Sequence, residues 1–494
     1  MKIKKANILI LIISSIILAS SNFLGKYLYF TNFDEILFAL GYSGKGTDIN
    51  LVLKTILHIS IGTILIFIVL YAIFYNILFK KNILTKSGKQ LYPFKFFNNH
   101  NTLFSYLVLI LSIIILLGRI GFYDYVIYDL QRSSIIENNY VNPKKVNVNF
   151  KEKRNLIFIL VESLESSLFT KEQGGQWNYE VIPEMYKLLN DEDAVVFYNK
   201  NKSQQVNMIE GASWTSASIV SNLSGIPLKN DFKNNKRNSK YFMKNVYSLG
   251  DLLKDNGYYN EVISGARTSF GKVNEYFYTH GYNIIDADNL SDYNLKMNKT
   301  DVGVWGFNDR YLFETAKKRL NIISNKNEPF NLELITIDTH FMDGFKGEYT
   351  ETKYDRQYEN VYSTTSKLIY EFVNWVKKQD YYDNTTIVIA GDHLGMQSNL
   401  FENKNLDNRY VYYCIINPRN KDAKYSDRII TALDNYPTIV YAIGGDIEGD
   451  KLALGVNLFS NQKTLAEKYN FEYISKELKK KSKFYGIILK DGSR

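Results

Sequence analysis

The sequence is almost free of cysteine and poor in histidine, and both shortages limit what the protein can be. Its 494 residues include one cysteine, Cys414, so no intrachain disulfide can form and a disulfide-stapled scaffold is excluded. There are only five histidines, and His58 and His100 fall in the most apolar third of the chain, which leaves too few for a His-rich two-metal cage. Hydrophobic residues at 45% and charged residues at 22% exclude wholesale disorder and collagen-like repeats.

Most of the chain also lacks any excess of positive charge. The formal net charge is +9, but residues 1–150 hold 15 Lys plus Arg against 6 Asp plus Glu, which accounts for the whole surplus. Residues 151–494 hold 45 residues of each sign and have no net charge. We therefore expect no nucleic-acid partner, because the larger part of the chain has no footprint for a polyanion.

Long apolar runs are confined to the same first third of the chain. A membrane-spanning helix needs roughly 20 apolar residues, and we predict spans at about 6–22, 54–78 and 102–119. Residues 1–120 would then form an all-α transmembrane domain of about three helices. The first run could instead be a signal peptide, but no clear cleavage site follows it and further spans do, so we favour an uncleaved anchor.

The lysines predict how this membrane domain is oriented. Loop 80–100 contains five lysines and no acidic residue, whereas loop 22–50 contains two lysines and three acidic residues. Positively charged loops stay in the cytoplasm. We therefore expect a multi-pass protein of the bacterial inner (cytoplasmic) membrane, with loop 22–50 and everything after residue 120 on the periplasmic or extracytoplasmic side.

The remaining sequence predicts an α/β domain behind a polar linker at 121–152. Continuous apolar runs, typical of strands buried on both faces, alternate with helix-like stretches. The strand-like runs are 155–161, 331–337, 385–390 and 410–416, and the helix-like stretches are 246–256, 309–322 and 361–378. This alternation predicts a sandwich with a mostly parallel central sheet over residues 153–462. A C-terminal tail follows at 463–494, and its basic stretch 476–483 is interpreted as a solvated helix face in preference to a lipid contact.

Three of the predicted strands are followed by side chains of the kinds that bind metals. Glu162 follows the first strand, Asp338 and His340 follow the second, and Asp392 and His393 follow the third. Because the carboxyl ends of parallel strands meet at one edge of a sheet, we expect these side chains to converge there. Unrelated helix caps are the alternative. Carboxylates combined with imidazoles favour one divalent first-row metal such as Mn²⁺ or Zn²⁺.

A hydroxyl-rich segment offers a candidate nucleophile. Residues 211–220, GASWTSASIV, have the pattern of a loop that enters a helix, and a helix N-terminus favours a bound phosphate. A metal beside a hydroxyl can make that hydroxyl nucleophilic. Taken alone, the segment is better explained as a Ser/Thr cap that has no chemical role.

Several segments together resemble the phosphoglycerol transferases of the alkaline phosphatase and sulfatase superfamily. The resemblance is strongest to the periplasmic enzymes that modify glucans and weaker to the lipoteichoic acid synthases. The matching segments are NLIFILVESLES (155–166), GASWTSASIVSNLSGIPL (211–228), residues 265–282, GVWGFND (303–309), TIDTHFMDGF (336–345) and TIVIAGDHLGMQSN (386–399). They cover most of residues 153–460 and imply an alkaline phosphatase-like sandwich.

The resemblance also implies a metal site and a nucleophile. Glu162, Asp392 and His393 would bind one divalent metal, with Mn²⁺ expected and Zn²⁺ or Mg²⁺ as alternatives. Thr215 would be the nucleophile and would also touch the metal. Ser213 is a rival nucleophile, but the family's threonine aligns with Thr215, after the tryptophan.

The implied reaction moves glycerol phosphate from phosphatidylglycerol to an envelope glycan through a phosphothreonine intermediate. His340 would lie beside the donor phosphate as a candidate proton donor, and Lys272 and Asp338 would be further substrate contacts. Three predicted spans, where lipoteichoic acid synthases have five, favour single transfer over polymer synthesis. Thr215 also lacks the following Pro and Arg of the sulfatase C/S-x-P-x-R motif, which argues against formylglycine chemistry.

Two alternative functions stay open at the level of sequence. The same site could serve a phosphodiesterase or another phospho-head-group transferase, of the phosphoethanolamine or lipoteichoic acid type. The domain could also be a catalytically inactive binder of envelope glycans.

Overall fold

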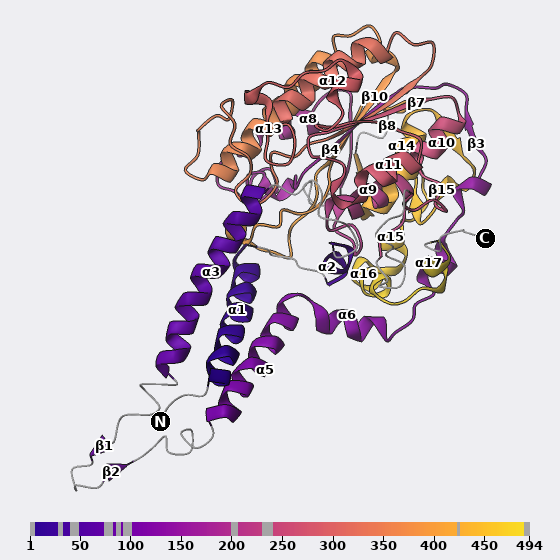
Figure 1. The fold of residues 1–494 in the computed structure, drawn as a ribbon. Helices are drawn as coiled ribbons and strands as arrows, with labels where there is room; N and C mark the ends of the chain where they lie inside the picture. Colours follow the sequence, from indigo (N-terminus) through magenta and orange to yellow (C-terminus); the bar gives the residue numbers. More distant parts are fainter. Residues whose placement is uncertain are drawn as a thin grey trace. The chain divides into compact units, whose positions relative to one another are not determined.

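The computed structural model describes residues 5–27, 33–39, 49–73, 83–84, 90–91, 101–198, 206–229, 241–421 and 425–488. The chain divides into two compact units. Met1–Phe33 and Thr47–Ile127 form the first, which we call the helical unit, and Asp34–Gly46 and Tyr128–Arg494 form the second, which we call the sheet unit (Figure 1).

Long apolar helices make up the helical unit. They are α1 (Lys5–Tyr27), α3 (Ile49–Ala72) and α5 (Asn101–Arg119). Within the described ranges, three helices are long and apolar enough to cross a membrane, over Lys5–Tyr27, Val52–Ala72 and Thr102–Arg119, which confirms the predicted number. Helix α1 packs against both α3 and α5. Gly62 of α3 permits a close approach, because a Cβ atom there would lie 3.3 Å from Cβ of Ala19.

An eight-stranded sheet organises the sheet unit. Its parallel part runs in the order β10 (Thr385–Gly391), β4 (Asn155–Val161), β9 (Phe330–Ile335), β7 (Tyr259–Ser264) and β8 (Asn283–Ile285). On the other side of β10, β11 (Tyr413–Ile416) runs antiparallel to both β10 and β5 (Ala194–Tyr198), and β12 (Tyr425–Asp427) forms the edge. The predicted mostly parallel α/β sheet is therefore confirmed.

Helices cover both faces of this sheet (Figure 1). One hydrophobic core contains residues of α9 (Thr215–Ser224), α10 (Leu249–Asp255), α11 (Val273–Thr279) and α14 (Asn435–Ala442). The opposite core contains residues of α8 (Pro183–Leu189), α12 (Asp309–Ile323) and α13 (Gln357–Val376). Alternate residues of β4 enter the two cores, with Phe158 in the first and Ile159 in the second. This explains why the strand is apolar along its whole length.

Shorter elements complete both units. They are β1 (Ile83–Leu84), β2 (Gln90–Leu91), α6 (Phe122–Asp129), α7 (Ile135–Asn139), β3 (Val148–Phe150), β6 (Val206–Asn207), β13 (Ile430–Thr431), β14 (Gly445–Ile447), β15 (Lys451–Leu452), β16 (Gly455–Val456), α15 (Leu465–Tyr469), α16 (Phe471–Lys479) and α17 (Lys483–Ile488). The C-terminal segment is anchored, because Ile474 and Leu478 of α16 are buried in the first core.

Helix α2 (Phe33–Ala39) has an unexpected place in the fold. It lies between α1 and α3 in the sequence, yet its residues from Asp34 onward belong to the sheet unit. Phe38 is buried in the same core as α9 and α14. A segment that joins two candidate membrane spans is therefore part of the α/β domain.

The three central strands end together. Val161 of β4 pairs with Gly391 of β10, and Leu160 pairs with Ile335 of β9. The residues that follow these strands therefore emerge at the same edge of the sheet, which is where open α/β sheets place their ligand sites.

Candidate active site

Glu162, Asp392 and His393 meet at this edge of the sheet. One potential ligand atom of each lies within 4.8 Å of the others, and no other such group is found within the described ranges. The His393 Nε2 atom is 3.3 Å from Oδ2 of Asp392 and 3.6 Å from Oε1 of Glu162. All three side chains are buried. The strand ends thus bring two carboxylates and an imidazole together away from water.

The hydrogen bonds around these side chains leave ligand atoms free to face a cation. Asp392 Oδ1 accepts hydrogen bonds from the backbone N–H groups of Ser163, at 2.7 Å, and His393, at 2.6 Å. Asp392 Oδ2 is buried and has no hydrogen-bond partner in the part of the chain that the structure describes. His393 Nδ1 lies 2.9 Å from the carbonyl of Leu394, so Nδ1 keeps a proton and Nε2 is the ring nitrogen that would bind a cation once it has lost its own proton.

The electrostatics of the cluster also fit a bound cation. Burial and the neighbouring Glu162 raise the pKa of Asp392 to about 7. Burial alone would lower the pKa of His393, but Asp392 and Glu162 raise it to about 8. Buried carboxylates that face each other need a proton or a metal between them. The donor set of two carboxylates and one imidazole suits one divalent cation such as Mn²⁺ or Zn²⁺.

The Thr215 hydroxyl lies beside this cluster. Thr215 is the first residue of α9, and its Oγ1 donates a 3.3 Å hydrogen bond to Oε2 of Glu162. Trp214 before it has an extended backbone and caps no helix N–H with its side chain. Thr215 therefore projects from the start of a helix, where the free N–H groups favour an anionic group.

Two serines fix the position of α9 at the site. Ser218 Oγ donates a 2.6 Å hydrogen bond to the carbonyl of Asp392, and Ser216 Oγ donates a 2.8 Å bond to the carbonyl of Gly271. Gly271 has φ +64°, and a Cβ atom there would come within 2.5 Å of Ser216 Oγ. Thr215 is thus held between the cluster and the turn that presents Lys272.

Lys272 follows this turn as a buried cation. Its own φ is +58°, and its side chain is 8% exposed. The Nζ atom lies 5.5 Å from the centre of the Phe242 ring. Burial lowers the pKa of Lys272, while Glu275 opposes this shift.

His340 lies near the cluster as a neutral ring. Its Nδ1 is 2.6 Å from the carbonyl of Phe341, and its ring packs 4.9 Å from Trp305 and 4.8 Å from Phe341. Burial lowers the pKa of His340 to about 4, and His393 contributes to this shift. At neutral pH the Nδ1–H group therefore donates to the backbone and Nε2 carries a lone pair.

Asp338 is engaged in contacts within the protein. Its Oδ2 accepts hydrogen bonds from the Tyr349 hydroxyl and from the backbone N–H of Asp309, the latter at 3.1 Å. Its Oδ1 is buried without a hydrogen-bond partner in the described residues. Burial and Asp309 raise the pKa of Asp338. The predicted substrate role of Asp338 therefore depends on Oδ1 alone.

A buried ion pair that the sequence did not reveal supports the loop after His393. Arg409 Nε donates to Oε2 of Glu165 at 2.9 Å, and Nη2 donates to Oε1 of Glu165 and to the carbonyl of Gly395. Gly395 N–H donates back to Glu165 at 2.6 Å. Glu165 stands three residues after Glu162, but nothing in the sequence links it to Arg409.

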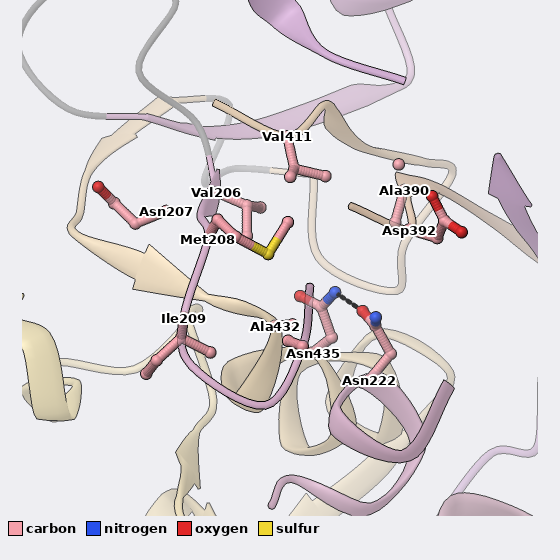
Figure 2. Close-up of a pocket in the computed structure, with 12 residues that line it drawn as sticks. Val206, Asn207, Met208, Ile209, Asn222, Ala390, Asp392, Val411, Ala432 and Asn435 are labelled. Carbon is pink, nitrogen blue, oxygen red and sulfur yellow. Dashed lines mark hydrogen bonds between the residues drawn. The ribbon is translucent and has the colours of Figure 1, made fainter. Parts of the chain in front are cut away.

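A small cavity lies behind Asp392 (Figure 2). Its volume is about 10 Å³, roughly the minimum that one water needs. Asn222 of α9 and Asn435 of α14 form a hydrogen bond on its wall. Asn222 also donates to the Ser218 carbonyl at 2.8 Å, so this wall continues the support of α9.

Comparison with known proteins identifies the family. The profile described as Sulfatase matches residues 154–445, more than half of the chain. Phosphoglycerol transferase I of Salmonella choleraesuis is 28% identical over 332 residues, which cover 65% of this chain and 41% of that protein. The protein of the same name from Shigella flexneri is 29% identical over 321 residues, which cover 63% and 39%. The chain thus spans about two fifths of the length of these curated relatives.

Solved structures give weaker matches. A Vibrio parahaemolyticus protein in the alkaline phosphatase superfamily has a TM-score of 0.49 and 22% identity, over 65% of this chain and 74% of that one. The lipoteichoic acid synthase LtaP from Listeria monocytogenes has a TM-score of 0.46 and 17% identity, over 64% and 79%. The profile match is decisive and confirms the resemblance to the superfamily: this chain belongs to the sulfatase family.

Proposed function

We propose that this chain is a membrane-anchored phosphoglycerol transferase that moves glycerol phosphate from phosphatidylglycerol to an envelope glycan. The observation that carries the proposal is the hydrogen bond between the Thr215 hydroxyl and Glu162, within a buried three-ligand cluster. The relatives named phosphoglycerol transferase I support the choice of head group.

In the first step, Thr215 Oγ1 attacks the phosphorus of phosphatidylglycerol. An Oγ1–P bond forms, the P–O bond to diacylglycerol breaks, and the proton of the threonine hydroxyl passes on balance to the departing alkoxide. In the second step, a glycan hydroxyl attacks the same phosphorus: the glycan O–P bond forms, the Oγ1–P bond breaks, and the hydroxyl proton passes on balance to Thr215 Oγ1. The reaction thus forms and then consumes a phosphoglycerol-threonine.

Glu162, Asp392 and His393 would hold the divalent cation, and Mn²⁺ is the metal we expect. Bound there, it would neutralise charge on the phosphoryl oxygens and would lower the pKa of the Thr215 hydroxyl. Thr215 is already oriented without it by its place at the start of α9 and by Glu162. Most of the catalysis of phosphoryl transfer comes from positioning and charge stabilisation of this kind.

The remaining predicted residues have supporting roles. Lys272 supplies positive charge for the phosphate from the turn bound to α9. Because His340 is neutral at rest, its Nε2 must first accept a proton before it can donate one to the leaving alkoxide. Asp338 can contact substrate only through its unpartnered Oδ1.

The membrane anchor would keep this site beside its lipid donor. The positive loop 80–100 predicts that loop 22–50 and the domain after residue 120 face the extracytoplasmic side. The membership of residues from Asp34 onward in the sheet unit supports this topology, because segments that pack into one core lie on the same side of a membrane.

The proposal can be tested with the full-length chain in vesicles that contain phosphatidylglycerol labelled in its head-group glycerol. We expect a phosphoglycerol mass increment on the Thr215 peptide, and transfer of the label to an added glucan. Free glycerol phosphate as the sole labelled product, with and without glucan, would identify a phosphodiesterase. An increment on Ser213 would reassign the nucleophile. The absence of any adduct or turnover would favour a glycan-binding protein.

A further inference from the structure

Helix α2 reaches the neighbourhood of the nucleophile from a loop between two candidate spans. Phe38 is 2% exposed, and its ring lies 6.1 Å from Trp214 and 6.0 Å from Phe242. Trp214 directly precedes Thr215, and the Phe242 ring lies beside the ammonium group of Lys272. Phe38 thus packs between Trp214, which precedes the proposed nucleophile Thr215, and Phe242, which lies beside the Lys272 ammonium group.

Glu35 lies on the same side of α2 as Phe38. Residues three apart in a helix are neighbours on one face, so the packing of Phe38 directs Glu35 toward the same region. Its carboxylate is partly buried and interacts electrostatically with His393, and burial raises its pKa to about 7. Outside the Glu162 cluster itself, Glu35 is therefore a further acidic group whose charge acts on His393.

Charged residues also lie near Asp34 of α2. Lys229 attracts the Asp34 carboxylate, whereas Glu210 repels it. The Nζ atom of Lys229 donates hydrogen bonds of 2.5 Å to the backbone carbonyls of Lys479 and Lys480. Consecutive helix residues point about 100° apart, so Asp34 and Glu35 face different surroundings. The packing of Phe38 on one side of α2 is thus accompanied by the attraction between Asp34 and Lys229 on another.

The chemistry of the head group then indicates what Glu35 binds. A phosphoryl group on Thr215 is anionic, so a carboxylate gains nothing from contact with it. The rest of a phosphoglycerol group is a vicinal diol, whose O–H groups are hydrogen-bond donors. A carboxylate accepts such bonds, and these charge-assisted bonds are stronger than those between neutral groups.

We propose that α2 forms a wall of the substrate site and that Glu35 binds the hydroxyl groups of the glycerol end of the head group. This inference rests on the proposed transferase function and adds the origin of its head-group selectivity. It also makes α2 (Phe33–Ala39), which lies between the first two spans in the sequence, part of the active site. The glycerol remains attached to phosphorus after diacylglycerol leaves, so Glu35 holds it through both steps.

The experiment compares two donors with the full-length chain in vesicles: phosphatidylglycerol, and phosphatidylpropanol, whose head group lacks the diol. Formation of the Thr215 adduct is followed by mass spectrometry. We expect the wild type to prefer phosphatidylglycerol by about tenfold in kcat/KM, which corresponds to about 1.4 kcal/mol. In Glu35→Ala the preference should fall to within about twofold, because only the diol-containing donor loses a contact.

Two further variants separate binding from structure. Phe38→Ala should slow both donors by a similar factor, since it disturbs the wall without removing the acceptor. Glu314→Gln, at an exposed position of α12, should change neither rate. A wild-type preference that persists in Glu35→Ala, or a loss of equal size for both donors, overturns the role of Glu35 while leaving the transferase function intact. A wild type that forms no adduct with phosphatidylglycerol overturns both proposals.

Discussion

The ion pair between Glu165 and Arg409 should be among the costliest single contacts to break in the sheet unit. Both side chains are fully buried, and Arg409 also donates a 2.7 Å hydrogen bond to the carbonyl of Gly395. The Arg409 guanidinium carbon lies 3.6 Å from the centre of the Phe401 ring. Arg409→Met keeps most of the apolar stem but leaves the Glu165 carboxylate without its cation.

The expected cost follows from the burial of the pair. Removing one partner of a buried ion pair costs about 3–5 kcal/mol, because the other charge stays in a medium of low polarity. Domains are stable by only about 5–15 kcal/mol, so Arg409→Met should remove a large fraction of the stability. The double variant Glu165→Gln/Arg409→Met should cost less than the sum of the single changes, because neither charge remains.

Chemical unfolding followed by tryptophan fluorescence measures this effect. All four tryptophans of the chain lie in the sheet unit: Trp177, Trp214, Trp305 and Trp375. Their fluorescence therefore reports the unfolding of that unit. Arg267→Met is the matched control. Its ion pair with Asp288 is at the surface, where such pairs contribute about 0–1 kcal/mol. If Arg409→Met shifts the unfolding midpoint no more than Arg267→Met, the reasoning is refuted.

Three further predictions concern the active site. Thr215→Ala should abolish the covalent adduct in mass spectrometry, whereas Thr215→Ser should retain part of it; equal adduct in Thr215→Ala would exclude this nucleophile. With pKa values of about 7 for Asp392 and about 8 for His393, both groups take up protons as pH falls from 8 to 6. Calorimetry should then show Mn²⁺ affinity at least ~10-fold lower at pH 6, because protons compete with the metal; equal affinities would contradict the assignment. Gly271→Ala should reduce transfer, measured in a radiolabel assay, more than Gly257→Ala does. Both glycines have positive φ, but only at Gly271 would a Cβ atom meet an α9 hydroxyl, that of Ser216, at 2.5 Å. Similar losses in the two variants would show that backbone strain alone matters.

The sequence determined the features that depend on local pattern. The apolar run 155–161 predicts a strand buried on both faces, and β4 indeed contributes to both cores. The three apolar runs near the N-terminus correspond to helices long enough to span a membrane. Polar residues placed directly after strands predict a shared edge, because parallel strands end together, and Glu162, Asp392 and His393 do meet there.

Only the tertiary structure decided the features that depend on long-range contact. Glu165 finds Arg409 more than 200 positions away in the sequence, and no local pattern encodes that pairing. The same is true of helix α2, whose short sequence between two spans gives no sign that Phe38 packs beside Trp214. The charge of His340 also follows from folding, since burial is what lowers its pKa to about 4. Periodicity is a property of neighbouring residues, whereas desolvation and ion pairing depend on which distant segments the fold brings into contact.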